Sequence, residues 1–325
     1  MNRNQRKKEL DAFNRRRFLQ GLIGGSGLSV ICPAGFAAVA EKSSFADTPS
    51  VLVDVTRCIG CRACMRACKI TNELPNDTEL SEGFPFKWDL QKLRFDQWTV
   101  VNPVTGKNSD GTEVTRNVKT QCMHCLEPTC VSVCPVGALT KSELGPILYN
   151  ADRCIGCRYC IMACPFDIPK YEWYSGLSPV VGKCQFCTRP RLSQGQLPAC
   201  VESCPTGALK FGRRDALLFE AKARIDSHPE RYIDHVYGEK EAGGTAWLYM
   251  SDVPFENLGF KSSIETAPMP PLTWDVLSKI PIMAAAMAGL FGTLAWSLNR
   301  REKSEQETSE QGKPEQKTSE QEKSA

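Results

Sequence analysis

The sequence predicts an α+β protein in which a cysteine-rich module occurs twice, with small strand insertions and one C-terminal transmembrane helix. Two observations carry this prediction. Sixteen of the 17 cysteines fall into four groups of four that share short motifs, and nineteen consecutive residues near the C-terminus carry no charge. The chain has 325 residues, of which 42% are hydrophobic and 24% charged, as in an ordinary globular protein. Its net charge of +3 gives no reason to expect a nucleic-acid partner.

The first forty residues have the features of an export signal. Met1–Arg17 carries seven basic and two acidic side chains. The stretch NRRRFLQ, with the pair Arg15 and Arg16, resembles the twin-arginine export motif. Ala38–Ala40 has the small-x-small form that signal peptidases cleave. The twin-arginine route exports folded proteins, which suits a protein that receives a metal cofactor in the cytoplasm. The alternative is a basic anchor helix that stays attached, although this glycine-rich segment is a poor helix former.

The four groups of cysteines, called quartets here, share one spacing pattern. They are Cys58, Cys61, Cys64 and Cys68; Cys122, Cys125, Cys130 and Cys134; Cys154, Cys157, Cys160 and Cys164; and Cys184, Cys187, Cys200 and Cys204. Each begins C-x2-C and ends C-x3-C, and proline follows the last cysteine of three quartets. The first and third quartets have the spacing with which bacterial ferredoxins hold iron–sulfur clusters, where the fourth cysteine ligates the other cluster of a pair.

An internal repeat indicates a duplicated, bacterial-ferredoxin-like core with two [4Fe–4S] clusters in each module. CIGCRAC in the first quartet matches CIGCRYC in the third, and CPVGAL in the second matches CPTGAL in the fourth. Two alternatives fit less well. Structural zinc would use two C-x2-C pairs and no cysteine between them. A disulfide framework suits an exported protein, but C-x2-C-x2-C crowds thiols that could not all find partners.

The segments between and after the quartets predict a few regular elements. We expect strands at Trp98–Asn102 and Glu113–Thr120 around the turn-rich stretch PVTGKNSDG, a helix over Asp215–Ser227 and a strand over Thr245–Ser251. His124 stands between two cysteines, where it either packs or touches a cluster edge. Basic residues near the quartets either tune the clusters or form ordinary solvated surface: Arg57, Arg62, Arg66, Lys69, Arg153, Arg158, Lys183, Arg189 and Arg191.

The C-terminal apolar segment, Ile280–Leu298, predicts a membrane anchor. At ~1.5 Å per residue it reaches about 28 Å, close to the thickness of a hydrocarbon core. Arg300 and Arg301 follow directly and favour a cytoplasmic C-terminus. The alternative is a buried helix of a soluble protein. We therefore expect a signal peptide at 1–40, a four-cluster core at 41–212, a helix-and-strand extension at 213–271, a transmembrane anchor at 272–299 and a disordered cytoplasmic tail at 300–325.

The sequence contains no catalytic constellation. It has no Ser/His/Asp set, phosphate-binding loop or open metal site, so we expect no catalytic residues. A chain of clusters without a substrate site indicates electron transfer between other subunits.

The order and spacing of the quartets resemble those of the four-cluster electron-transfer subunits that serve molybdopterin oxidoreductases and respiratory hydrogenases. HVYGEKEAGGT at His235–Thr245 and VPFENL at Val253–Leu258 resemble, more narrowly, the iron–sulfur subunits of periplasmic nickel–iron hydrogenases of the hydrogenase-2 type. The resemblance implies a single-pass protein on the periplasmic face of the bacterial inner membrane. It would pass electrons from the hydrogenase small and large subunits to an integral membrane, quinone-reactive partner during anaerobic respiration.

The resemblance also implies which cysteines share a cluster. Set A would be Cys58, Cys61, Cys64 and Cys204; set B Cys68, Cys184, Cys187 and Cys200; set C Cys122, Cys125, Cys130 and Cys164; set D Cys134, Cys154, Cys157 and Cys160. An alternative identity is the beta subunit of a membrane-bound formate dehydrogenase or another molybdopterin oxidoreductase. In that group the export signal usually stands on the catalytic subunit. The signal on this chain therefore counts against that alternative. A redox-inert, membrane-tethered scaffold would be a different class and would lack visible absorbance from clusters.

Overall fold

The computed structural model describes residues 45–75, 90–108, 110–173, 180–271 and 278–311. The signal residues Arg15, Arg16, Ala38 and Ala40 lie outside these ranges. The main strands and helices are β1 (Pro49–Asp54), α3 (Ala63–Thr71), β2 (Thr99–Lys107), β3 (Glu113–Gln121), α5 (Thr129–Ser132), β4 (Leu139–Lys141), β5 (Ile147–Tyr149), α6 (Tyr159–Met162), β6 (Lys170–Tyr171), β7 (Val181–Gly182), α7 (Ala199–Glu202), β8 (Leu209–Arg213), α8 (Arg214–Ser227), β9 (Trp247–Met250) and α10 (Ile280–Gln311). Short 3-10 helices are η1 (Phe45–Asp47), η2 (Val55–Arg57), η3 (Ala151–Arg153), η4 (Leu192–Gln194), η5 (Glu241–Gly243) and η6 (Phe255–Leu258).

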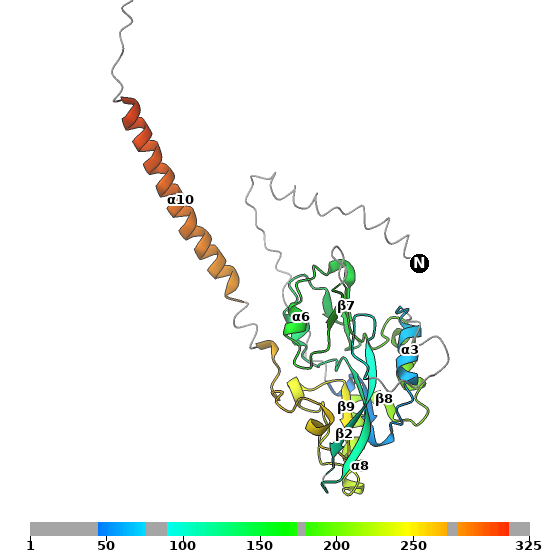
Figure 1. Cartoon of the computed structure of the whole chain (residues 1–325). Helices are drawn as coiled ribbons and strands as arrows, with labels where there is room; N and C mark the ends of the chain where they lie inside the picture. The colour runs from blue at the N-terminus through cyan, green and yellow to red at the C-terminus, as the bar shows by residue number, and fades with distance from the viewer. Residues whose placement is uncertain (1–44, 76–89, 109, 174–179, 272–277, 312–325) are drawn as a thin grey trace, which may run out of the picture. The chain divides into compact units, whose positions relative to one another are not determined.

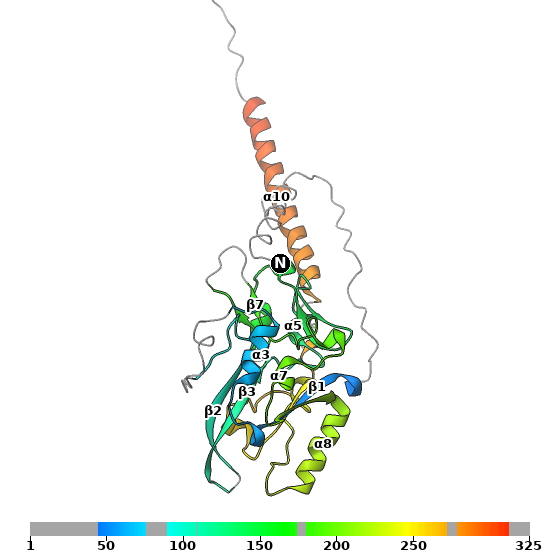
Figure 2. The same ribbon diagram turned by 90° about the vertical axis from the view of Figure 1, so that its right-hand side faces the viewer.

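A three-stranded sheet in the order β8-β1-β9 lies at the centre of the core (Figure 1). Strand β1 runs antiparallel to β8 and parallel to β9. Both faces of β1 are buried, because Leu52 packs with α8 while Val51 and Val53 enter the larger cluster on the other face. Figure 2 shows α8 beside β1. The sheet therefore joins a segment before the first quartet to a segment after the fourth.

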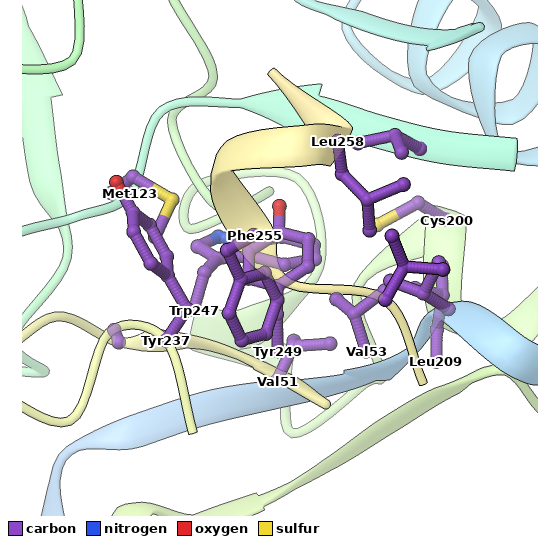
Figure 3. Packing of buried hydrophobic residues seen from close by; sticks show 14 of the residues in the cluster. Val51, Val53, Met123, Cys200, Leu209, Tyr237, Trp247, Tyr249, Phe255 and Leu258 are labelled. Carbon is purple, nitrogen blue, oxygen red and sulfur yellow. The ribbon is translucent and has the colours of Figure 1, made fainter. Parts of the chain in front are cut away.

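Aromatic side chains fill the larger cluster. Tyr237, Trp247, Tyr249 and Phe255 pack there with aliphatic residues from β1, β8 and η6 (Figure 3). Cys200 belongs to the same cluster, so at least one quartet borders the main hydrophobic core. Burying such large side chains contributes about 1.5–3 kcal/mol each to folding.

The described residues form three smaller sheets besides, and each is a two-stranded antiparallel pair: β2 with β3, β4 with β5, and β6 with β7. The first of them corrects one expectation. Strand β2 continues through Pro103 to Lys107, where the sequence predicts a turn, and β3 begins at Glu113. The ribbon is longer because Val104 and Val114 pack against the main cluster, so tertiary burial outweighs local turn propensity.

The extension after the fourth quartet agrees with its predicted elements. Helix α8 begins one residue before the predicted helix, and Leu217, Ala221 and Ile225 are its buried apolar residues. Leu218, which the spacing marks as core, is partly buried beside them. Strand β9 is confirmed within the wider range that the sequence predicts.

Helix α10 extends beyond the predicted apolar segment. Among the described residues, one stretch, Ile280–Glu302, is long and apolar enough to cross a membrane, with a mean hydropathy of 1.5. The helix then continues to Gln311, whereas a disordered tail is expected from residue 300. The reason is composition: Glu, Gln, Lys and Arg are good helix formers and extend a helix that the apolar segment has already nucleated.

Candidate metal centres

The first and third quartets lie on loops of the same backbone shape. In each loop a glycine, Gly60 or Gly156, and an arginine, Arg62 or Arg158, adopt φ between 58° and 74°. Helices α3 and α6 begin directly after the arginines. A Cβ at Gly60 would lie 2.5 Å from the side-chain oxygen of Asn117 on β3. The left-handed turns therefore curl the loop tightly and bring its cysteines to one side.

The second and fourth quartets share a different local structure. Pro128 and Pro198 precede the one-turn helices α5 and α7. After the last cysteine of each quartet, Gly137 or Gly207 adopts a positive φ of 59° or 60° and turns the chain into β4 or β8. Because β8 follows the fourth quartet and pairs with β1, which precedes the first, these two quartets lie close together. In the same way, the pairing of β4 with β5 brings the second quartet close to the third.

The electrostatic environment of the thiols follows sets A to D. The pKa of Cys64 is raised to about 11. Burial is the largest cause, Lys119 lowers the pKa, and the other three thiols of set A raise it. Burial and the other three thiols of set B raise the pKa of Cys68 well above its usual range. The same two causes act on Cys125 in set C, and on Cys160 in set D, whose pKa is raised to about 11. Each of these thiols therefore lies close enough to the three partners that the resemblance implies for their charges to act on it.

Direct contacts support the first two sets independently. One pocket is lined by all four cysteines of set A together with Lys119. In set B, the side-chain amide nitrogen of Asn72 lies 3.7 Å from the sulfur of Cys68 and 3.9 Å from that of Cys187. These two cysteines come from the first and fourth quartets, so the last cysteine of the first quartet reaches across to the other loop.

Three hydrophobic clusters link the sets in the order A, B, C, D. The first contains Cys64 and Cys204 of set A with Cys200 of set B. The second contains Cys184 of set B with Cys122 and Cys164 of set C. The third contains Cys130 of set C with Cys134, Cys154 and Cys160 of set D. Neighbouring sets are therefore linked in the order A, B, C, D, and this series is called the file below.

The residues around the quartets divide into solvated and buried groups. Five of the nine basic residues noted in the sequence are exposed: Arg57, Arg66, Arg153, Arg158 and Arg189. Lys69 and Lys183 are buried, and the Lys183 ammonium donates to the carbonyl oxygens of Ile147 and Cys184 at 2.6 and 3.0 Å.

His124 is a packed side chain. It is 1% exposed, contacts the Phe186 ring edge to face, and accepts a hydrogen bond at Nδ1 from the Ile147 N–H at 3.0 Å. Burial, with the charge of Lys183, lowers its pKa well below the usual value. The imidazole is therefore neutral, with its proton on Nε2, which has no hydrogen-bond partner among the described residues.

Two further residues at the sets escaped the sequence analysis. Asn72 lies one residue beyond α3, and Lys119 lies on β3 three residues before the second quartet. On an alternating strand, Lys119 shares the polar side with Asn117 and Gln121, which normally faces water. Here that side faces the cysteines. Only the burial of the β2–β3 ribbon distinguishes this side of β3 from an ordinary solvated one. No local sequence signal marks Lys119.

The donor sets fit iron–sulfur clusters. The sixteen cysteines of the quartets are all free thiols, and no disulfide joins them. Within the described residues, no three His, Cys, Asp or Glu side chains converge on one point as a single ion requires. A [4Fe–4S] cube instead takes one thiolate at each of four separate iron corners. Four soft sulfur donors around a common space, as in set A, match that requirement.

Comparisons with known proteins agree with this chemistry. The 4Fe-4S dicluster domain family matches residues 115–214, which hold the second, third and fourth quartets. A protein of Nitratidesulfovibrio vulgaris is 42% identical over 295 residues, covering 90% of this chain and 78% of that protein. The hydrogenase-2 operon protein HybA of Escherichia coli O157:H7 is 37% identical over 273 residues, covering 76% and 83%.

A third relative comes from another enzyme class. The formate dehydrogenase-O iron-sulfur subunit of Escherichia coli K12 is 32% identical over 289 residues, covering 85% of this chain and 93% of that protein. The similarity to these relatives extends well beyond the quartets. The chain belongs to the family of 4Fe-4S ferredoxin-type electron-transfer subunits that includes iron–sulfur proteins of hydrogenases and formate dehydrogenases.

Proposed function

We propose that the chain holds four [4Fe–4S] clusters, one in each of sets A to D, and carries electrons between a periplasmic nickel–iron hydrogenase and a quinone-reactive membrane partner. The observation that carries the proposal is the gathering of sixteen thiols into four sets, each completed by a cysteine from another quartet. A two-cluster ferredoxin exchanges its fourth ligands in the same way.

The same observation supports a duplicated core. One module would consist of the first and fourth quartets joined by β1 and β8, and the other of the second and third quartets joined by β4 and β5. The paired loop shapes support this division. In each module, an arginine in the left-handed conformation directly precedes one helix, and a proline directly precedes the other. We propose 41–212 as this four-cluster core.

When bound, the clusters supply sites for one-electron oxidation and reduction along the file. The chain itself has three tasks. Its thiolates hold the four sites in the order A to D, its hydrophobic clusters exclude water between neighbouring sets, and N–H groups donate to the sulfurs. The Ala138 and Phe186 amides, for example, lie 3.2 and 3.3 Å from the sulfurs of Cys134 and Cys184. Such hydrogen bonds stabilise negative charge on the ligands and tune the potentials.

The D end of the file suits contact with another subunit. Cys157 of set D is exposed, and large apolar side chains lie exposed near it in sequence, at Ile155, Tyr159 and Met162. The exposed Trp173 ring contacts the guanidinium of Arg158 in the same loop. Exposed apolar side chains grouped together commonly mark protein interfaces. A redox partner that docks over Cys157 would approach the last set of the file.

We further propose that the protein is exported by the twin-arginine route and anchored by residues 272–299, with a cytoplasmic C-terminus. The basic twin-arginine sequence at Arg15 and Arg16, the apolar part of α10 and the arginines that follow it support this topology. It places the four-cluster core on the periplasmic side.

A second candidate, the beta subunit of a formate dehydrogenase or other molybdopterin oxidoreductase, is favoured by the 93% coverage of the formate dehydrogenase-O subunit. Anaerobic affinity purification from detergent-solubilised membranes, followed by mass spectrometry, separates the two. Co-purification of nickel–iron hydrogenase subunits supports the first candidate, and a molybdopterin subunit supports the second. Purified chain without iron and sulfide, or without the electron paramagnetic resonance (EPR) signals of reduced clusters, overturns both.

A further inference from the structure

Lys119 is a buried ammonium that has no counter-ion among the residues that the structure describes. The residue is 3% exposed. Its Nζ donates to Thr99 Oγ1 at 2.6 Å and to Gln121 Oε1 at 2.7 Å, and it lies 4.5 Å from the centroid of the Trp247 ring. Among the ion pairs of the described residues none includes Lys119. Its hydrogen-bond partners are thus neutral, and burying an unpaired charge is costly.

The surroundings hold this ammonium in place. The Gln121 amide nitrogen donates to the Tyr249 hydroxyl at 2.6 Å, and that hydroxyl donates to the Lys119 carbonyl oxygen at 3.0 Å. Gln121 and Tyr249 are both fully buried. The network joins β3 to β9 and fixes Gln121, so the ammonium cannot swing towards solvent without breaking its two buried hydrogen bonds.

The ammonium lies at the junction of sets A and B. It lines the pocket formed by the four cysteines of set A. The Trp247 ring that it contacts packs in the same hydrophobic cluster as Cys200 of set B. Its charge also lowers the pKa of Cys184 and Cys200 in set B, against the larger effect of burial. Two of its three N–H groups are used by Thr99 and Gln121. The fixed charge therefore acts on two neighbouring cluster sites at once.

We propose that Lys119 is the shared counter-charge of the two clusters held by sets A and B, and that it raises the reduction potential of both. The inference rests on the proposed function, because it requires that clusters occupy these sets. A cluster with four thiolate ligands is anionic, and reduction adds one electron and one further negative charge. No bond forms or breaks, and Lys119 stays protonated. A buried cation stabilises the more negative, reduced form most, since the low local dielectric strengthens the interaction.

The proposal explains why lysine stands at this position. A neutral side chain could pack against Trp247 without the cost of burying a charge. The anionic clusters offset that cost for lysine. A purely structural role would instead require only the two hydrogen bonds and the packing on Trp247. The two roles differ in their effect on potential.

The test is a potentiometric titration of the full-length protein, followed by EPR, in Lys119→Met and Lys119→Gln. Signals of sets A and B are first assigned with Cys61→Ala and Cys187→Ala. We expect the equilibrium constant for reduction to fall at least tenfold at sets A and B, which is about 59 mV for a one-electron couple. Sets C and D should stay within a twofold change. Lys210→Met removes an exposed, ion-paired lysine and should leave all four sets unchanged.

Each outcome decides the proposal. Unchanged potentials at sets A and B in loaded neutral variants would overturn it. If both neutral variants lose clusters, Lys119→Arg decides: retention of all four clusters supports a role of the charge, and loss assigns Lys119 to packing and refutes the proposal. Wild-type protein without clusters would instead refute the proposed function, and so the two failures are distinguishable.

Discussion

Replacing Cys164 with alanine should empty set C, although Cys164 stands in the same quartet as three cysteines of set D. The structure surrounds Cys125 with Cys122, Cys130 and Cys164. Alanine removes the fourth thiolate and offers no oxygen as a substitute. One cluster of four is lost, so iron should fall by about a quarter, from about 16 to about 12 atoms per chain. Because set C lies between sets B and D in the file, hydrogen-dependent quinone reduction should also be lost.

The assay combines iron and sulfide analysis with EPR of the reduced protein, and Cys160→Ala is the matched control. Cys160 is four residues away in the same quartet but borders the other thiols of set D. The two variants should each lose about a quarter of the iron and should lose different EPR signals. Loss of the same signal in both variants would refute the crossed arrangement, since it would mean that each quartet fills one site by itself.

Three further outcomes follow from single features. Gly182→Ala would place a Cβ 2.0 Å from the Phe95 carbonyl oxygen, so we expect a loss of about 1–3 kcal/mol, visible as a lower Tm; an unchanged Tm would mean that the strand shifts freely. The hydrogen bond to Glu241 raises the pKa of His235 above its ordinary 6.5, so the pair stabilises the fold below pH 6.5 and loses this effect as pH rises. His235→Gln should flatten this part of the Tm profile, and an unaltered profile would contradict the assignment. Truncation before Ile280 should move the protein from membranes to the soluble fraction, and retention in membranes would point to another anchor.

Sequence spacing predicts the cysteine loops well because their geometry is local. A glycine and an arginine in left-handed conformations shape each C-x2-C-x2-C loop, and both stand in the repeated motif itself. The gathering of cysteines from different quartets depends instead on β1 pairing with β8, which no local pattern encodes. The resemblance to known subunits supplied those sets. The structure brings the same cysteines together, and their role as ligands remains a prediction.

The ribbon of β2 and β3 shows where local reasoning fails. Pro103 and Gly106 are typical of a turn, yet contacts with the distant core extend β2 through both of them. Lys119 was missed for a related reason. Its strand alternates like a half-solvated one, and only the tertiary fold turns its polar side inward, next to Gln121 and Tyr249.

The pairing of the outermost quartets has a consequence for synthesis. Sets C and D are complete once the ribosome has passed Cys164, whereas sets A and B wait for the fourth quartet. Cys64 and Cys204 are 140 residues apart, a delay of about 7–28 s at about 5–20 residues per second. The architecture is nested, with an inner pair of sites that closes early and an outer pair that closes last. The cysteines of the first quartet in a nascent chain therefore lack their partners from the fourth quartet throughout translation of the core. Sets A and B can be completed only when the first and fourth quartets come together.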